Sequence, residues 1–217
     1  MTTQPSTDNV NMPSAGAAPL LLIPSGVAWG LWYFGMNLVG WGEPGSAAYS
    51  RYEIYNRIAP VVLILLLAAT QYARHILRGI LGRTGSAGSH LASAGLAVMA
   101  AGSALEFWAF TESAYAPGSL RGYGWTTYCL GLLLFYIGAA VFGFALRRVS
   151  GFGAAGMLLM GWLPAGAVIS AAGSLAGAAL PAFSVAVALC GSAYVLIGYR
   201  LWAAPSAASD SRGKGSV

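Results

Sequence analysis

Glu106 is the residue most able to do chemistry in this chain, because it is a lone acid inside an apolar segment, residues 91–111, of membrane length. Placing an ionised carboxylate in hydrocarbon is costly, so the group must pair, face water or be protonated. One interpretation is a ligand or proton site. The other is a structural acid at the outer rim, paired with Arg57 or Arg121 or hydrogen-bonded to Tyr or Trp donors. Both predict that Glu106 points into a helix bundle.

Small and aromatic residues accompany this acid. Gly102 and Ser103 lie one helical turn earlier and leave room for a ligand or another helix, while Trp108 follows closely. The candidate ligand or proton site comprises Ser103, Glu106, Trp108, Glu53, Glu112 and Arg121. A surrounding vestibule of acidic and aromatic residues is expected from Trp41, Tyr52, Glu53, Trp108, Glu112 and Trp125.

His75 and His90 are the only two histidines, and they flank the turn between two expected membrane helices. Neutral imidazole is a common axial ligand, so haem b binding is an alternative. Their offset along the helices is about 8 Å at the helical rise, which disfavours a shared iron. No cofactor and no metal site are therefore predicted. The only cysteines, Cys129 and Cys190, fall inside apolar segments and imply no disulfide framework.

Recognisable catalytic signatures are missing from the sequence. It contains no HExxH, GxSxG, P-loop or dinucleotide fingerprint, and its only lysine is Lys214, outside every apolar segment. The net charge of +5 is spread over the ends of apolar runs, which does not indicate a nucleic-acid surface. We expect a protein that is not an enzyme and that does not bind nucleic acid.

The composition indicates an all-α integral membrane protein. Hydrophobic residues make up 57% of the 217 residues and charged residues only 8%, with mean hydropathy +0.67, whereas soluble domains carry roughly 25% charged residues. The apolar runs are continuous, as in membrane helices, and do not alternate as in a barrel. Six transmembrane helices are expected at about 19–41, 58–80, 91–111, 125–146, 153–172 and 182–202, between polar tails 1–18 and 203–217.

The distribution of basic residues predicts the orientation. Six spans place both termini on one side, and that side carries eight of the eleven Lys and Arg residues. Positive residues mark the cytoplasmic face, so both termini are expected in the cytoplasm. The protein is expected in a plasma or inner membrane. Glu106 then lies near the outer face, and the lipid bilayer is the expected surrounding.

Three connecting segments carry local signals. Tyr49, Tyr52, Glu53 and Asn56 have helical spacing, which predicts a short helix lying in the membrane interface. The sequence GRTGSAGS, residues 82–89, predicts a turn between the second and third spans, and residues 112–124 predict a turn-rich loop. In the first span, Trp29, Trp32 and Tyr33 predict a packed aromatic face or part of a ligand pocket.

Two functions remain open. Small-residue motifs permit close helix approach and favour a non-catalytic accessory or structural subunit that packs against other membrane proteins or against itself. They are Gly26-xxx-Gly30, Ala139-xxx-Gly143, Gly166-xxx-Ser170 and Gly173-xxx-Gly177. Packing within one bundle explains them equally. The alternative is a small proton- or cation-coupled carrier that uses Glu106. The block GSALEFWAFTES…SLRGYGW resembles a pattern in bacterial polytopic membrane proteins, and this resemblance implies no residue roles.

Overall fold

The computed structural model describes residues 18–39, 46–108, 118–177 and 182–203. All regular elements in these ranges are helices, in agreement with the expected all-α class. They are α1 (Ala18–Val39), α2 (Ala47–Asn56), α3 (Ala59–Trp108), α4 (Leu120–Leu146), α5 (Gly153–Leu175) and α6 (Ala182–Ala203). The expected polar tails lie outside the described residues, except for Ala18 and Ala203, which are helical.

The long α3 is a hairpin of two helical limbs that reverses at Gly82. This glycine has φ 61° and ψ −171°, a conformation that is essentially restricted to glycine. The reversal is shown by contacts between residues that lie at similar positions before and after Gly82 in the sequence. Arg74 Nη1 hydrogen-bonds His90 Nε2, and Trp108 Nε1 donates to the carbonyl oxygen of Arg57 at 2.9 Å. The expected turn at residues 82–89 is therefore present, but it is confined to Gly82, and helix resumes directly afterwards.

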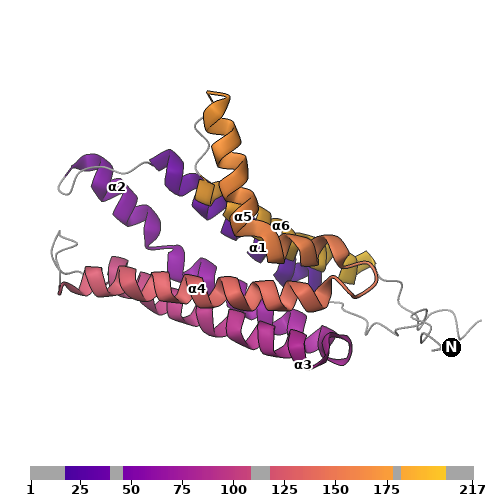
Figure 1. Ribbon diagram of the computed structural model, residues 1–217. Helices are drawn as coiled ribbons and strands as arrows, with labels where there is room; N and C mark the ends of the chain where they lie inside the picture. Colours follow the sequence, from indigo (N-terminus) through magenta and orange to yellow (C-terminus); the bar gives the residue numbers. More distant parts are fainter. Residues whose placement is uncertain (1–17, 40–45, 109–117, 178–181, 204–217) are drawn as a thin grey trace, which may run out of the picture.

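The second limb of α3, residues 83–108, packs against α4 through two facing rows of glycines. Each row repeats every seven residues: Gly88, Gly95 and Gly102 on α3, and Gly124, Gly131 and Gly138 on α4. A Cβ atom added at Gly95 would lie 2.2 Å from the Phe135 nitrogen, and one added at Gly138 would lie 2.1 Å from the Ala92 nitrogen. The two backbones are thus in contact, and Figure 1 shows these helices running side by side.

Small residues also join the other neighbouring helices. A Cβ atom at Gly143 of α4 would lie 2.6 Å from the Gly156 oxygen of α5, and one at Gly26 of α1 would lie 2.4 Å from the Gly191 oxygen of α6. Gly166 of α5 meets Ala186 of α6 in the same way. With α1 also contacting α3, the helices close into a ring. Gly26, Gly143 and Gly166 belong to three of the four expected small-residue motifs, so residues of these three motifs pack against other helices of the same chain.

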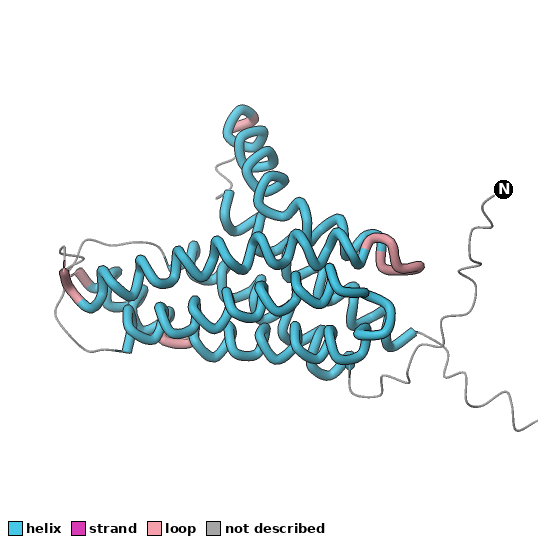
Figure 2. The backbone as a smooth tube through the Cα atoms, turned by 60° about the horizontal axis from the view of Figure 1, so that its bottom comes forward, coloured by secondary structure: helices cyan, strands magenta, loops and turns pink. Residues whose placement is uncertain are grey.

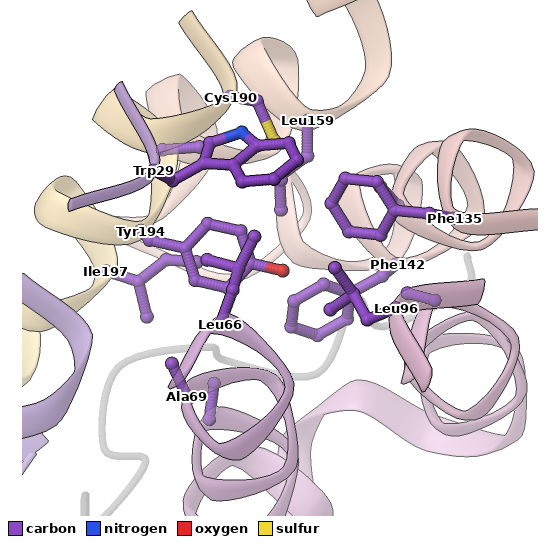
Figure 3. Close-up of a cluster of buried hydrophobic side chains, with 14 of the residues drawn as sticks. Trp29, Leu66, Ala69, Leu96, Phe135, Phe142, Leu159, Cys190, Tyr194 and Ile197 are labelled. Atoms are coloured by element: carbon purple, nitrogen blue, oxygen red, sulfur yellow. The ribbon is translucent and has the colours of Figure 1, made fainter. Parts of the chain in front are cut away.

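The core lies where α1, α3, α4, α5 and α6 meet, and Figure 3 shows Trp29, Phe135, Leu159 and Tyr194 converging there. Trp29 contacts Phe135 edge-on, with ring centroids 6.3 Å apart. The Tyr194 hydroxyl hydrogen-bonds Thr70 Oγ1 at 2.7 Å, so this buried polar atom is satisfied. The aromatic face expected in the first span is thus partly core, with Trp29 fully buried.

Two serines fix where helices begin. Ser46 caps α2 by accepting a hydrogen bond from the Tyr49 nitrogen, and Ser119 caps α4 by accepting one from the Gly122 nitrogen. The cap at Ser119 starts α4 five residues before the expected start at residue 125. The end of the expected turn-rich loop, residues 120–124, is therefore helical.

The C-terminal part of α5 leaves the bundle. Pro164 lies inside this helix, and no residue from Ala167 to Gly177 is buried. Figures 1 and 2 show this end of α5 standing away from the other helices. Its side chains include Val168 and Leu175, which are 68% and 92% exposed.

Four helical segments of the described chain are long and apolar enough to cross a membrane. They are Ala47–Trp108, Leu120–Leu146, Gly153–Leu175 and Phe183–Ala203, and a shorter apolar helix covers Leu20–Met36. The first of these contains the α3 hairpin. Several apolar helices suitable for a membrane-embedded protein are thus present, as the composition indicates.

Adding a methyl group at the glycine contact should destabilise the bundle. Gly131→Ala places a Cβ atom 2.5 Å from the Met99 nitrogen, and overpacking of this kind costs about 1–3 kcal/mol. We expect a lower thermal midpoint in detergent, measured by loss of the helical circular dichroism signal. Gly79→Ala is the matched control because nothing lies within 4 Å of its added Cβ. Equal midpoints for the two variants would contradict the close contact.

Candidate functional site

A pocket of about 250 Å³ lies among five of the helices. Its walls come from α1 (Trp32, Tyr33, Met36), α2 (Tyr52, Asn56), α3 (Ser103, Glu106, Phe107), α4 (Trp125, Tyr128, Cys129, Leu132) and α6 (Phe183). Aromatic side chains predominate, and Glu106 is the only Asp, Glu, Lys, Arg or His side chain among these lining residues. The pocket thus brings together two of the candidate residues, Ser103 and Glu106, with two vestibule residues, Tyr52 and Trp125.

Glu106 is positioned by the glycine contact between α3 and α4. Ser103, Glu106 and Phe107 have the spacing that places them on one helix face. A Cβ atom added at Gly124 would lie 2.6 Å from the Glu106 nitrogen, so α4 lies directly against the backbone of this acid. Glu106 is only 4% exposed and Ser103 only 1%. As the sequence predicts, the carboxylate is buried within the bundle.

Pairs of packed rings form the aromatic walls. Trp125 stacks on Tyr128 with centroids 5.8 Å apart and an interplanar angle of 11°. Tyr33 meets Phe183 edge-on at 4.9 Å, and its hydroxyl hydrogen-bonds the hydroxyl of Tyr128 across the pocket. These contacts fix the rings of α1, α4 and α6 relative to one another.

The short helix α2 closes the pocket on one side. It buries Tyr49, Tyr52 and Asn56, three of the residues whose spacing predicted a helix here. Asn56 Nδ2 donates to the carbonyl oxygen of Tyr52 at 2.8 Å, and Tyr52 packs edge-on against Phe107 with centroids 6.0 Å apart. The expected short helix is thus present and contributes two side chains to the site, while its expected position in the membrane interface stays a prediction.

Arg121 ties α2, α3 and α4 together beside the pocket. Its Nη2 forms an ion pair with Glu53, its Nη1 donates to the Tyr49 hydroxyl, and its Nε donates to the backbone oxygen of Glu106 at 3.3 Å. The side chains of Arg121 and Glu53 are 11% and 25% exposed, so this pair is partly shielded from solvent. Arg121 therefore lies next to Glu106, as expected, and forms an ion pair with Glu53.

The remaining candidates lie elsewhere. Trp108 is half exposed, bonds the Arg57 carbonyl and does not line the pocket. Glu53 faces Arg121 and is also outside the lining. Glu112 and Trp41 are outside the described residues. Among the described residues of the expected vestibule, Tyr52 and Trp125 line the pocket.

Sequence reasoning missed Met36, Tyr128, Cys129, Leu132 and Phe183. Tyr128 and Cys129 follow Trp125 at spacings of three and four residues, which places them on one face of α4. That spacing was a usable signal. Met36, Leu132 and Phe183 gave none, because an apolar residue in a membrane helix has the same sequence context whether it faces lipid or a pocket.

The histidines and cysteines occupy separate positions. His75 and His90 are both exposed, and His90 Nε2 hydrogen-bonds Arg74 Nη1. Both cysteines are free thiols, Cys129 exposed at the pocket wall and Cys190 buried in the core. No group of three His, Cys, Asp or Glu side chains gathers as a metal site in the described part of the chain.

Comparisons with protein families, with curated proteins and with solved structures found no match to this chain. The site is therefore interpreted from its own geometry. A buried carboxyl group whose described surroundings are mainly aromatic can exchange a proton or contact a polar group of a ligand.

Removing the Arg121 side chain should loosen the helices around the pocket. Arg121→Leu breaks the pair with Glu53 and two further hydrogen bonds, and hydrogen bonds to charged groups contribute about 1.5–3 kcal/mol each. We expect a lower thermal midpoint, with a smaller further loss when Glu53→Gln is added to the same variant. Arg51→Leu, at an exposed position on α2, is the control. Additive losses from Arg121→Leu and Glu53→Gln would contradict the pairing.

Proposed function

We propose that the protein is a non-catalytic, membrane-embedded carrier that binds a small ligand or a proton at Glu106. The observation that supports this proposal is the buried carboxylate in an aromatic pocket of about 250 Å³. Intramembrane acids facing a bundle interior commonly mark substrate or proton pathways. The absence of catalytic motifs from the sequence is consistent with binding and transfer without covalent chemistry.

The same proposal includes six membrane crossings with both termini in the cytoplasm of a plasma or inner membrane. In support, each limb of the α3 hairpin is longer than the roughly 20 residues that a membrane crossing requires. The excess of Lys and Arg on the side of the termini supports the orientation. Glu106 and α2 then lie towards the outer face.

Reporter fusions test this orientation. Alkaline phosphatase, which is active only outside the cytoplasm, should be active when fused after Gly118 and inactive when fused after Gly151. These residues lie in the turns before α4 and before α5, at opposite ends of α4. The reverse pattern of activities would invert the orientation, and equal activity at both positions would contradict a crossing by α4.

An accessory role is the second candidate. The part of α5 beyond Pro164 supports it, because exposed apolar side chains such as Val168 and Leu175 leave the bundle there. The small-residue motifs give this role less support than they did in the sequence, since Gly26, Gly143 and Gly166 contact helices of the same chain. The carrier is preferred because the pocket has a defined geometry.

Substitution of Glu106 tests the carrier. In proteoliposomes with a trapped pH-sensitive dye, the wild-type protein should conduct protons under an imposed potential. Glu106→Gln should abolish this flux because the amide cannot exchange a proton at neutral pH, whereas Glu106→Asp should retain part of it. Ser174→Ala, on the exposed part of α5, is the control.

Unchanged flux in Glu106→Gln would remove this acid from the mechanism. A wild-type protein that conducts nothing and that co-purifies with a larger complex in mild detergent would favour the accessory role instead.

A further inference from the structure

We propose that one end of the helix bundle binds the phosphate groups of anionic phospholipids. This basic end comprises the turn of α3, the end of α4 and the end of α6, and it is defined by five exposed arginines: Arg78, Arg83, Arg147, Arg148 and Arg200. The inference goes beyond the carrier, because it involves neither Glu106 nor its pocket. It needs only that the apolar helices are embedded in a bilayer.

The antiparallel packing of α3 and α4 places arginines from both helices at one level. A Cβ atom added at Gly85 would lie 2.9 Å from the Cβ atom of Ala145. Arg83 precedes this contact by two residues on α3 and Arg147 follows it by two residues on α4, so the antiparallel helices hold both at the same level. Figure 1 shows the turn of α3, the connection from α4 to α5 and the C-terminal end of α6 at the same end of the molecule.

No acidic side chain compensates these charges within the described part of the chain. The two acids described, Glu53 and Glu106, lie at the opposite end, where Arg121 near the start of α4 contacts both. The five arginines form no ion pair with any described residue, and arginine stays protonated in proteins. The basic end therefore carries a local excess of positive charge that attracts anions.

One aromatic ring orders two of these arginines. The Cζ atoms of Arg147 and Arg148 lie 4.6 and 4.4 Å from the ring centroid of Phe144. A guanidinium held in this way offers a planar fork of N–H donors, which matches the oxygens of a phosphate group. A bound anion also reduces the repulsion between the two neighbouring cations. The pair is thus preorganised for a phosphate.

The position of the basic end favours a lipid headgroup over a soluble phosphate compound. Arg147 and Arg148 directly follow α4, an apolar helix of 27 residues. Arg200 lies beside the exposed Tyr199 and Trp202, whose ring centroids are 6.1 Å apart. Tyr and Trp are enriched at the level of the headgroups, and arginines at the ends of membrane helices extend to that level. Basic clusters next to membrane helices attract anionic lipids.

Lipid retention tests this inference. The purified full-length protein is reconstituted in vesicles of equal parts phosphatidylcholine and phosphatidylglycerol with identical acyl chains. It is then extracted in mild detergent, and its bound lipids are counted by mass spectrometry. We expect phosphatidylglycerol to be retained at least about tenfold over phosphatidylcholine, since each arginine near a membrane surface contributes about fivefold. Higher salt should reduce this preference because it screens exposed charges.

Matched variants locate the site. Arg148→Gln should lower the preference about fivefold, and adding Arg147→Gln should lower it further. Arg51→Gln, at an exposed position of α2 at the opposite end, is the control and should keep the wild-type preference. Lysine at both positions, Arg147→Lys with Arg148→Lys, should give an intermediate value because lysine keeps the charge and lacks the planar fork. Thermal midpoints show whether every variant folds.

The outcomes also distinguish the source of the phosphate. Equal retention of the two lipids, or equal losses in Arg148→Gln and Arg51→Gln, would overturn the proposal. So would displacement of the lipid by glycerophosphoglycerol, the headgroup without acyl chains, or by a single-stranded oligonucleotide, because the ligand would then be soluble. Proton flux is a separate measurement. Loss of the lipid preference leaves a Glu106-dependent carrier standing, and a lipid preference without Glu106-dependent flux leaves the basic end standing.

Discussion

The backbone contact between the second limb of α3 and α4 is the constraint on which the rest of the structure depends. Glycines repeated every seven residues keep the same face of each helix against the other, as in an antiparallel coiled coil. Their missing side chains allow the backbones to touch. Because membrane helices gain little from hydrophobic burial against each other, this close packing is a main source of their association.

The candidate site follows from that contact. Gly124 lies against the Glu106 backbone, so the acid is held at a fixed position beside α4. The same α4 supplies Tyr128 to the wall and Arg121 to the rim, where Arg121 reaches α2 through Glu53. The α3–α4 pair thus positions the buried carboxylate, part of the aromatic wall and the arginine of a partly buried ion pair.

Much of the architecture was predictable because it depends on local sequence. Apolar runs predicted the helical class, and the helical spacing of Tyr49, Tyr52 and Asn56 predicted α2. The turn predicted at residues 82–89 is present at Gly82 but is shorter than the Gly- and Ser-rich stretch, because the residues after Gly82 are helical and pack against α4. The start of α4 was misjudged because the cap at Ser119 was not recognised.

The sequence by itself determined that the protein is helical and apolar and that Glu106 is an isolated acid. Only the tertiary structure decided which residues share a pocket with it, since Tyr33, Asn56, Tyr128 and Phe183 lie on four different helices. It also decided that Arg121 pairs with Glu53. The physical reason is that periodicity reports one helix at a time, while a pocket and an ion pair depend on how helices are rotated and placed against one another.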